Sequence, residues 1–267
     1  MEVKTKIAYT INGLVSGISG KNSAKNSDED RLLVLKYVSN LLNKNIINKD
    51  VDVFIFSWHT NFESHFNEYL NPTRIKLMSQ IDFPIPIHLR SGNTGRVFAY
   101  KSRWYGFKEV MQLVTDYENE NNFKYDLVVN NRFDICWHRN YDFSKLNTNQ
   151  FHIPLPCNRP TWGWPDENPE ISDHLFASNS DWMKNYSTLY DKIDEYTLPG
   201  QCPQWNTISN HFLMVWHLRK LGLLTNDIVK KSFRSLHHGD TNINTNMDIE
   251  IDYDIFRFRK LNKDNLK

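Results

Sequence analysis

The stretch Tyr125-Asp126-Leu127-Val128-Val129-Asn130-Asn131-Arg132-Phe133-Asp134 decides the fold prediction. Its short apolar run ends abruptly in two amides, an arginine and a carboxylate. This is typical of a buried parallel strand whose carboxyl end opens into a polar cleft, the edge at which open α/β sheets bind ligands. Arg132 and Asp134 alternate with Phe133, so on an extended chain both side chains point toward one site. This pattern suits a phosphate-and-metal ligand such as a nucleotide-sugar, and a surface ion pair at a strand end is the alternative.

The rest of the chain alternates between apolar strands and helices. Ser27 with the acidic residues 28–30 is typical of a helix N-terminus, because such side chains cap free N–H groups and suit the helix dipole. Apolar residues at steps of three and four from Val97 to Val114 predict the clearest helix. The predicted strands span 6–11, 51–56, 74–78, 125–131 and 174–177, and the predicted helices span 28–42, 97–114, 182–193 and 205–216.

This β-α-β-α order predicts an α/β fold, a single Rossmann-like three-layer domain with a mostly parallel central sheet. The chain has 267 residues, enough to bury a full core, and contains no repeat, low-complexity linker or compositional break. A segment rich in Pro, Trp and Asn from 155 to 170 predicts a long loop. We therefore expect one domain over residues 1–267, with its core at 5–240 and a C-terminal tail at 241–267.

The composition argues against several kinds of partner. The formal net charge is +1, so no general electrostatic attraction to nucleic acid or to an acidic membrane is expected. No apolar run reaches the roughly 18–20 residues that a transmembrane helix needs, and the N-terminus lacks the apolar core of a signal peptide. The three cysteines are widely spaced and contain no Cys-x-x-Cys pair, which is typical of reduced thiols. These features predict a cytoplasmic protein.

Five segments occur in an order that resembles a known family. They are Lys6-Ile7-Ala8 with the glycine-bearing loop after it, Asp52–Trp58, the aromatic helix at 97–117, residues 125–134, and Ile171–Phe176. Together they resemble GT-A-type glycosyltransferase-like proteins of large DNA viruses, phages and bacterial surface-polysaccharide clusters. The resemblance implies a GT-A-like fold, a UDP- or GDP-sugar donor, a divalent metal, and sugar transfer to a glycan, glycoconjugate or other hydroxyl acceptor. For a viral protein it implies the host cytoplasm.

The metal motif departs from the family pattern. Where GT-A enzymes usually have Asp-x-Asp, this chain has Arg132-Phe133-Asp134, so one carboxylate is missing and Arg132 could itself neutralise diphosphate charge. Hard cations prefer carboxylate oxygen, so Asp134 is the first candidate ligand for Mn²⁺ or Mg²⁺ and a candidate catalytic residue at the leaving diphosphate. His237 and His238 resemble the C-terminal histidine that completes the metal shell in the family, and a polar turn is the alternative.

Candidate donor-binding residues lie at the predicted strand ends and at the start of the aromatic helix. Arg132 and Asn131 end the strand at 125–131, and Trp58 ends the second strand, where the resemblance implies part of the nucleotide pocket. Arg103 lies near the start of the aromatic helix, and a helix N-terminus attracts phosphate. A solvated helix face is the alternative for Arg103.

The acceptor side is predicted from one carboxylate and one loop. Asp173 is the candidate catalytic base or acceptor-orienting carboxylate, because an inverting mechanism needs a carboxylate within hydrogen-bond reach of the attacking hydroxyl. His174 is an alternative base. Trp162 and Trp164 are candidate acceptor-binding residues because indole faces stack on sugar rings, although two tryptophans in a proline-rich loop also serve to pin it to a core.

Three functional hypotheses follow from these residues. The first is a metal-assisted glycosyltransferase. The second is a catalytically silent carbohydrate- or nucleotide-binding module on the same fold, which the missing first carboxylate of the metal motif favours. Another nucleotide-dependent enzyme, such as a methyltransferase, ranks last, because no glycine-rich loop is closely followed by an acidic strand end. A P-loop kinase or sulfotransferase is disfavoured separately, because the Gly20-Lys21-Asn22 stretch lacks the residues of a phosphate-binding P-loop.

Overall fold

The described part of the chain forms one nine-stranded mixed sheet. The structure is a computed structural model that describes residues 5–15, 27–46, 50–89, 94–137, 140–154, 171, 173–202, 209–225, 227–235 and 251–255. Its strands are Ile7–Gly13 (β1), Val51–Ser57 (β2), Arg74–Leu77 (β3), Leu127–Asn131 (β4), Ile135–Trp137 (β5), Phe151–Pro154 (β6), Leu175–Ser178 (β7), Val229–Ser235 (β8) and Ile251–Ile255 (β9). They lie in the order β3-β2-β1-β4-β7-β6-β8-β9-β5.

Most neighbouring strands in this sheet are parallel. The central group β3-β2-β1-β4 is parallel throughout, with Ile7 beside Val51 on one side and Leu127 on the other. Among the described strands, β7 and β5 run against their neighbours, whereas β6, β8 and β9 are again parallel to one another. The α/β class and the mostly parallel sheet, compatible with a Rossmann-like domain, are therefore confirmed.

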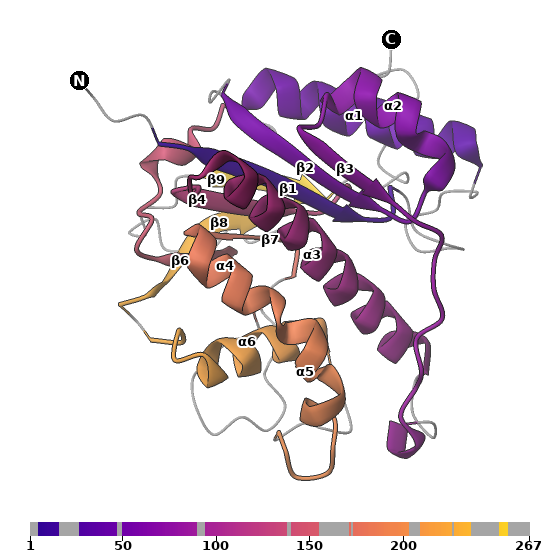
Figure 1. The fold of residues 1–267 in the computed structure, drawn as a ribbon, viewed down its shortest axis with the longest axis vertical. Helices are drawn as coiled ribbons and strands as arrows, with labels where there is room; N and C mark the ends of the chain where they lie inside the picture. The colour runs from indigo at the N-terminus through magenta and orange to yellow at the C-terminus, as the bar shows by residue number, and fades with distance from the viewer. Residues whose placement is uncertain are drawn as a thin grey trace.

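Helices cover both faces of the sheet, as Figure 1 shows. Helices α1 and α2 pack on one face, whereas α3 and α4 lie on the other face, with α5 packed against α3 and α6 packed against α5. The helices span Asp28–Asn45 (α1), Glu63–Leu70 (α2), Thr94–Asn121 (α3), Ser180–Ser187 (α4), Leu189–Tyr196 (α5) and Asn210–Lys220 (α6). Short 3₁₀ turns occupy Thr60–Phe62, Ile87–Leu89 and Phe143–Lys145.

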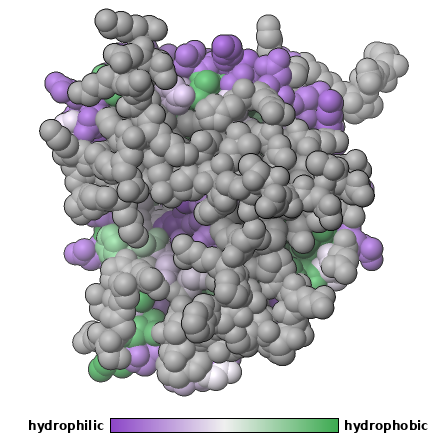
Figure 2. All heavy atoms as spheres, turned by 180° about the vertical axis from the view of Figure 1, so that it is seen from behind, coloured by the Kyte–Doolittle hydropathy of each residue, from purple (hydrophilic) through white to green (hydrophobic). Residues whose placement is uncertain are grey.

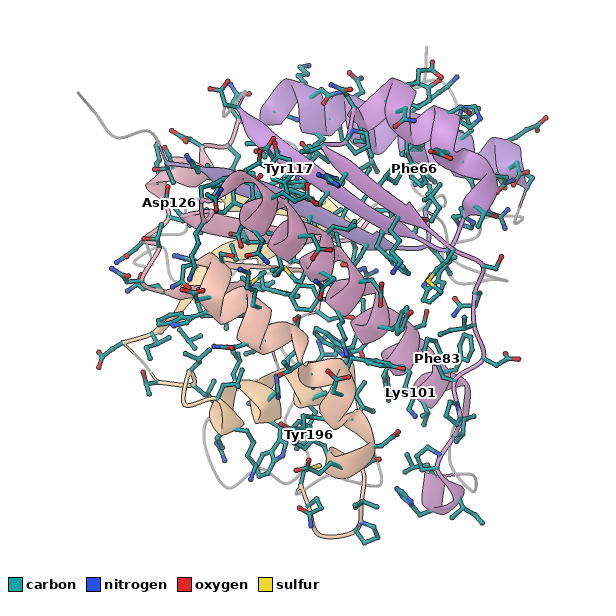
Figure 3. The ribbon with its side chains drawn as sticks, viewed as in Figure 1. Phe66, Phe83, Lys101, Tyr117, Asp126 and Tyr196 are labelled. Carbon is teal, nitrogen blue, oxygen red and sulfur yellow. The ribbon has the colours of Figure 1, made fainter. Side chains whose placement is uncertain are left out.

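Two apolar cores lie between these layers, one on each face. Ile7, Tyr9 and Ile11 of β1 pack with α1 and α2, whereas Ala8 packs with α3, because successive strand residues point to opposite faces. In Figure 3, Phe66 lies in the layer of α2, and Phe83 and Tyr196 lie on the opposite side of the sheet. Burial on both faces explains why the central strands read as continuous apolar runs.

Local signals set several element boundaries. The Ser27 hydroxyl accepts a hydrogen bond from the Asp30 backbone N–H at 3.1 Å, so α1 begins where the sequence predicts. The predicted helix at 182–193 is instead two helices, α4 and α5, which meet at Thr188. The Thr188 hydroxyl donates to the Asn185 carbonyl at 2.6 Å and lies 3.2 Å from a ring nitrogen of His217. These contacts occur at the break between the two helices.

The C-terminal part of the chain contributes to the sheet. Residues 251–255, which lie in the stretch expected to form a tail, are strand β9 between β8 and β5. The sheet thus extends beyond the expected core boundary, because β9 supplies the ladder partners of two other strands.

No helix in the described ranges is both long enough and apolar enough to span a bilayer. Hydrophilic side chains gather at the top of the molecule in Figure 2, on the side of α1 and α2.

Candidate active site

The candidate site lies where the direction of the chain through the sheet reverses. From β1 the chain passes to β2 and then β3 on one side, and α3 returns it to β4 on the other side of β1. The carboxyl ends of β1 and β4 therefore flank a topological switch point, the place where open α/β sheets bind ligands. Asn12 and Gly13 end β1, and Asn130, Asn131 and Arg132 lie at the end of β4.

Arg132 joins two carboxylates at this point. Its Nε donates to Asp134 Oδ1 at 2.8 Å, and its Nη2 donates to Asp134 Oδ2. Its Nη1 faces Asp173 Oδ1 at 3.4 Å. The side chain of Asp134 is 13% exposed and that of Asp173 is 9% exposed, so both charges are largely removed from water. The structure thus brings together three residues that the sequence predicts for the site.

Asp173 lies just before β7 among positively charged or protonatable groups. Burial alone would raise the pKa of its carboxyl, but Arg132, His211, His174 and Arg103 together hold the pKa well below its usual range. Asp173 is therefore ionised at neutral pH. Such a carboxylate is a weak base while these partners surround it.

Arg103 reaches the same cluster from helix α3. Its Nη1 donates to Asn12 Oδ1 at 2.6 Å, and its Nη2 donates to Asn130 Oδ1 at 2.9 Å and to the Asp173 backbone carbonyl at 3.1 Å. Burial lowers its pKa to about 10, which still leaves it charged at neutral pH. Arg103 thus ties α3 to β1, β4 and the segment before β7, and direct contact with a donor stays a prediction.

The amide that faces the cluster is that of Asn130, whereas the sequence predicts Asn131. Asn130 donates to Thr10 Oγ1 and Asn12 Oδ1, both at 2.9 Å, on the face that carries Arg103. Asn131 is buried on the opposite face, where its amide donates to the Tyr9 hydroxyl. This placement corrects the prediction that Asn131 faces the donor. The alternation of side chains along a strand could have predicted this, because residues 130 and 132 point to the same face and residue 131 points to the other.

Trp58 also lies away from the cluster. Its ring stacks on Tyr105 at a centroid distance of 5.5 Å and meets Phe56 and Phe83 edge-on, and the side chain is only 5% exposed. This corrects the expectation of a donor-binding role for Trp58, because its indole is enclosed in the core on the α3 face. A strand-end position alone did not separate an aromatic core residue from a ligand-binding one.

Four predicted residues lie outside the described part of the chain. These are Trp162, Trp164, His237 and His238. Their proposed roles at the acceptor and at the metal stay predictions.

Asn210 and Trp104 are site residues that sequence reasoning missed. Asn210 is the first residue of α6, and its Nδ2 donates to Asp173 Oδ2 at 2.9 Å. The indole N–H of Trp104 donates to Asn210 Oδ1 at 3.1 Å. The sequence predicts Trp104 as part of the apolar stripe of α3, and nothing in its spacing indicates that its nitrogen supports a polar site.

The described residues alone do not make a complete metal site. Nowhere in the described ranges do three or more His, Cys, Asp or Glu side chains form a group that could hold a metal ion. Both oxygens of Asp134 also accept hydrogen bonds from Arg132. A divalent ion at Asp134 would therefore need Arg132 to move and further ligands from elsewhere in the chain.

Comparison with known proteins adds no family. No family model matches the chain, and no curated protein matches it significantly. The functional argument therefore rests on the site itself. A cationic fork, two carboxylates and a second, buried arginine meet at the sheet edge formed by the carboxyl ends of β1 and β4, where open α/β sheets generally bind ligands. Such an arrangement is able to bind an anionic group beside a proton acceptor.

Proposed function

We propose that this protein is a glycosyltransferase of the GT-A type, which moves a sugar from a UDP- or GDP-sugar to a hydroxyl of a glycan or glycoconjugate. The observation that carries the proposal is the convergence of Arg132, Asp134 and Asp173 at the switch point of the sheet. The resemblance of five ordered sequence segments to that family supports the same conclusion.

In the proposed reaction Arg132 stabilises the leaving diphosphate. The bond from the anomeric carbon to the phosphate oxygen breaks as the acceptor oxygen bonds to that carbon, so negative charge grows on the phosphate. A planar guanidinium can donate to two phosphate oxygens at once, and a preorganised cation lowers the energy of the transition state. Arg103, held by Asn12 and Asn130, adds a fixed positive charge beside it.

Asp173 would accept the proton of the attacking acceptor hydroxyl, or orient that hydroxyl. Arg132 is the cation that lowers the pKa of this carboxyl most strongly. When Arg132 turns to the diphosphate, Asp173 loses part of that interaction, its pKa rises, and it becomes a stronger proton acceptor. Donor binding would in this way prepare the base for the second substrate.

A divalent ion, Mn²⁺ or Mg²⁺, remains part of the proposal. Asp134 would be one ligand, and His237 and His238 are the other candidates. Such an ion would supply additional neutralisation of diphosphate charge.

The substitution Asp134→Ala tests the proposal. We expect it to abolish donor hydrolysis and sugar transfer, because it removes the carboxylate that orients Arg132 and is the candidate metal ligand. Asp126→Ala is the matched control: Asp126 precedes the same strand at its opposite end, where it accepts a hydrogen bond from the Lys6 backbone N–H at 2.8 Å. Near-normal turnover in a folded Asp134→Ala protein would contradict the mechanism.

The second candidate function is a catalytically silent carbohydrate- or nucleotide-binding module. It is favoured by the bidentate pairing of Arg132 with Asp134, since this arginine stands where the metal motif would have its first carboxylate. A thermal-shift screen against UDP- and GDP-sugars and free glycans, each with and without Mn²⁺, separates the two functions. Stabilisation by glycans but by no nucleotide would favour the module.

A further inference from the structure

Asn210 connects the apolar core to the candidate base. Its amide lies between the indole N–H of Trp104, 3.1 Å from Oδ1, and Asp173 Oδ2, 2.9 Å from Nδ2. Trp104 is fully buried, and its ring contacts Phe107, Phe176 and Tyr186 at centroid distances of 5.9 to 6.1 Å. The core therefore fixes the position of the indole, and the indole fixes the amide.

Hydrogen-bonding chemistry determines which way this amide points. An indole nitrogen can only donate, so the oxygen of Asn210 must face Trp104 and its NH₂ group must face Asp173. An NH₂ group can only donate in turn, so it stabilises Asp173 as an acceptor and favours its ionised form.

The other atoms of Asp173 are held from different directions. Its backbone carbonyl accepts from Arg103 at 3.1 Å, and its Oδ1 faces Arg132 at 3.4 Å. The titratable groups near the carboxylate are His174, whose Nε2 lies 3.9 Å from Oδ1, and His211 of α6. With Oδ2 bound to Asn210, the carboxylate cannot rotate freely, and Oδ1 stays on the side of Arg132. The oxygen available to a ligand is thus selected by the contact that Asn210 makes with the other oxygen.

We propose that Asn210 is a positioning residue, whose amide, oriented by Trp104, turns Asp173 Oδ1 toward Arg132 and adds one hydrogen-bond donor to the carboxylate. The catalytic consequence rests on the proposed glycosyltransferase function. The effect on Asp173 itself belongs to the ligand-free protein and is measured without a substrate.

The substitution Asn210→Asp provides the test. It keeps the shape of the side chain, but it replaces the donor toward Asp173 with a second carboxylate, and two adjacent carboxylates cannot both ionise easily. In the ligand-free protein we expect the pair to titrate with an apparent pKa at least about one unit above the ordinary aspartate value. Side-chain carboxyl ¹³C NMR over a pH series measures this, with the wild type as reference.

Trp104→Phe is the second variant, and it covers the case in which Asn210→Asp does not fold. It keeps an aromatic ring in the core but removes the N–H that orients the amide, so we expect a smaller rise in the pKa of Asp173. If the two variants transfer sugar, we expect kcat to be lower than in the wild type. The acid limb of the kcat–pH profile should move to higher pH, while KM for the donor changes little.

Asn45→Asp is the matched control. Asn45 is another buried asparagine, at the end of α1, and it donates to the Trp137 carbonyl on the opposite face of the sheet from Asn210. This change should lower stability but leave the Asp173 titration as in the wild type. The positioning role would be overturned if Asp173 in Asn210→Asp titrated as in the wild type. It would also be overturned if Asn45→Asp shifted the Asp173 titration as much as Asn210→Asp does. A shifted titration without transfer activity would support it and reject the proposed function instead.

Discussion

Arg132 is the residue on which the candidate site depends most. It donates to both oxygens of Asp134 and faces Asp173, so one guanidinium organises two carboxylates at the carboxyl end of β4. A lysine would keep the charge but could not reproduce this fork, because an ammonium is a point charge on a flexible stem.

At this scale we predict that Arg132→Lys weakens nucleotide binding. Loss of a charge-assisted hydrogen bond reduces affinity by roughly 10- to 100-fold, and Arg132→Ala should lose more because it also removes the cation. Isothermal titration with the nucleotide that stabilises the wild type measures the difference. Arg74→Lys is the control, since Arg74 of β3 forms an exposed pair with Glu120 of α3. Equal affinities in wild type and Arg132→Lys would show that the fork does not contact the ligand.

Charge and strand position indicated which polar residues lie together, whereas packing decided the position of Trp58. Arg132, Asp134, Arg103 and Asp173 come together in the structure. Trp58 did not join them, because Tyr105 and Phe83 enclose it, and these contacts come from segments distant in the sequence.

Among the elements, helix α3 couples the core to the site. Trp104, Phe107, Val110, Met111 and Val114 on this helix are all buried, whereas Arg103 next to them reaches the polar cluster. The close approach of α3 to the sheet depends on Gly106. A Cβ added there would lie 3.0 Å from Phe56 Cδ1 and 3.1 Å from Asn12 Nδ2.

The second prediction concerns this contact. In an exposed helix, Gly→Ala stabilises by roughly 1 kcal/mol, but at Gly106 the new methyl group overpacks the interface and should destabilise the fold by about 1–3 kcal/mol. It should also displace Asn12, which holds Arg103. Urea unfolding measures the change. Ala99→Gly, at an exposed position of α3, is the control and should cost about 1 kcal/mol by helix propensity alone. A stabilised Gly106→Ala protein would contradict this packing argument.

For the whole molecule, buried histidines predict how stability depends on pH. His217 lies between Tyr196 and Thr188, and burial lowers its pKa to about 4; burial likewise lowers the pKa of His59 to about 4. In the unfolded chain both titrate near 6.5, so below that pH the unfolded state binds more protons than the native state. The contribution of these two neutral histidines to the free energy of unfolding is therefore fully present above about pH 6.5, and it is lost as the pH falls toward 4.

Between pH 7.5 and pH 5 we expect each histidine to account for a loss on the order of 2 kcal/mol in the free energy of unfolding. His217→Gln should remove its share of this difference, whatever the variant does to stability at pH 7.5. Urea unfolding at the two pH values measures it, and the partly exposed His65→Gln is the control. The same pH difference in wild type and His217→Gln would show that His217 is not kept neutral by burial.

The C-terminal strand gives a second prediction for the whole molecule. A chain cut after residue 240 loses β9, which pairs with both β8 and β5, and leaves two strand edges without partners. We expect lower stability and concentration-dependent aggregation, because unpaired edges template pairing with other chains. Light scattering together with thermal unfolding measures both. A shortened chain as stable and monomeric as the full one would show that β9 is dispensable.

The amino-acid sequence by itself determined the α/β class, the strands of the central parallel group and the long helix, because periodicity and burial on both faces are local signals. It also indicated the polar strand end from Asn130 to Asp134. Only the tertiary structure decided that Asn130 rather than Asn131 faces the cluster, that Trp58 belongs to the core, and that Asn210 contacts Asp173. The reason is physical: these hydrogen bonds, and the contacts of Trp58 with Phe83 and Tyr105, join residues 25 to 122 positions apart. No local pattern records which distant side chain will occupy the neighbouring space.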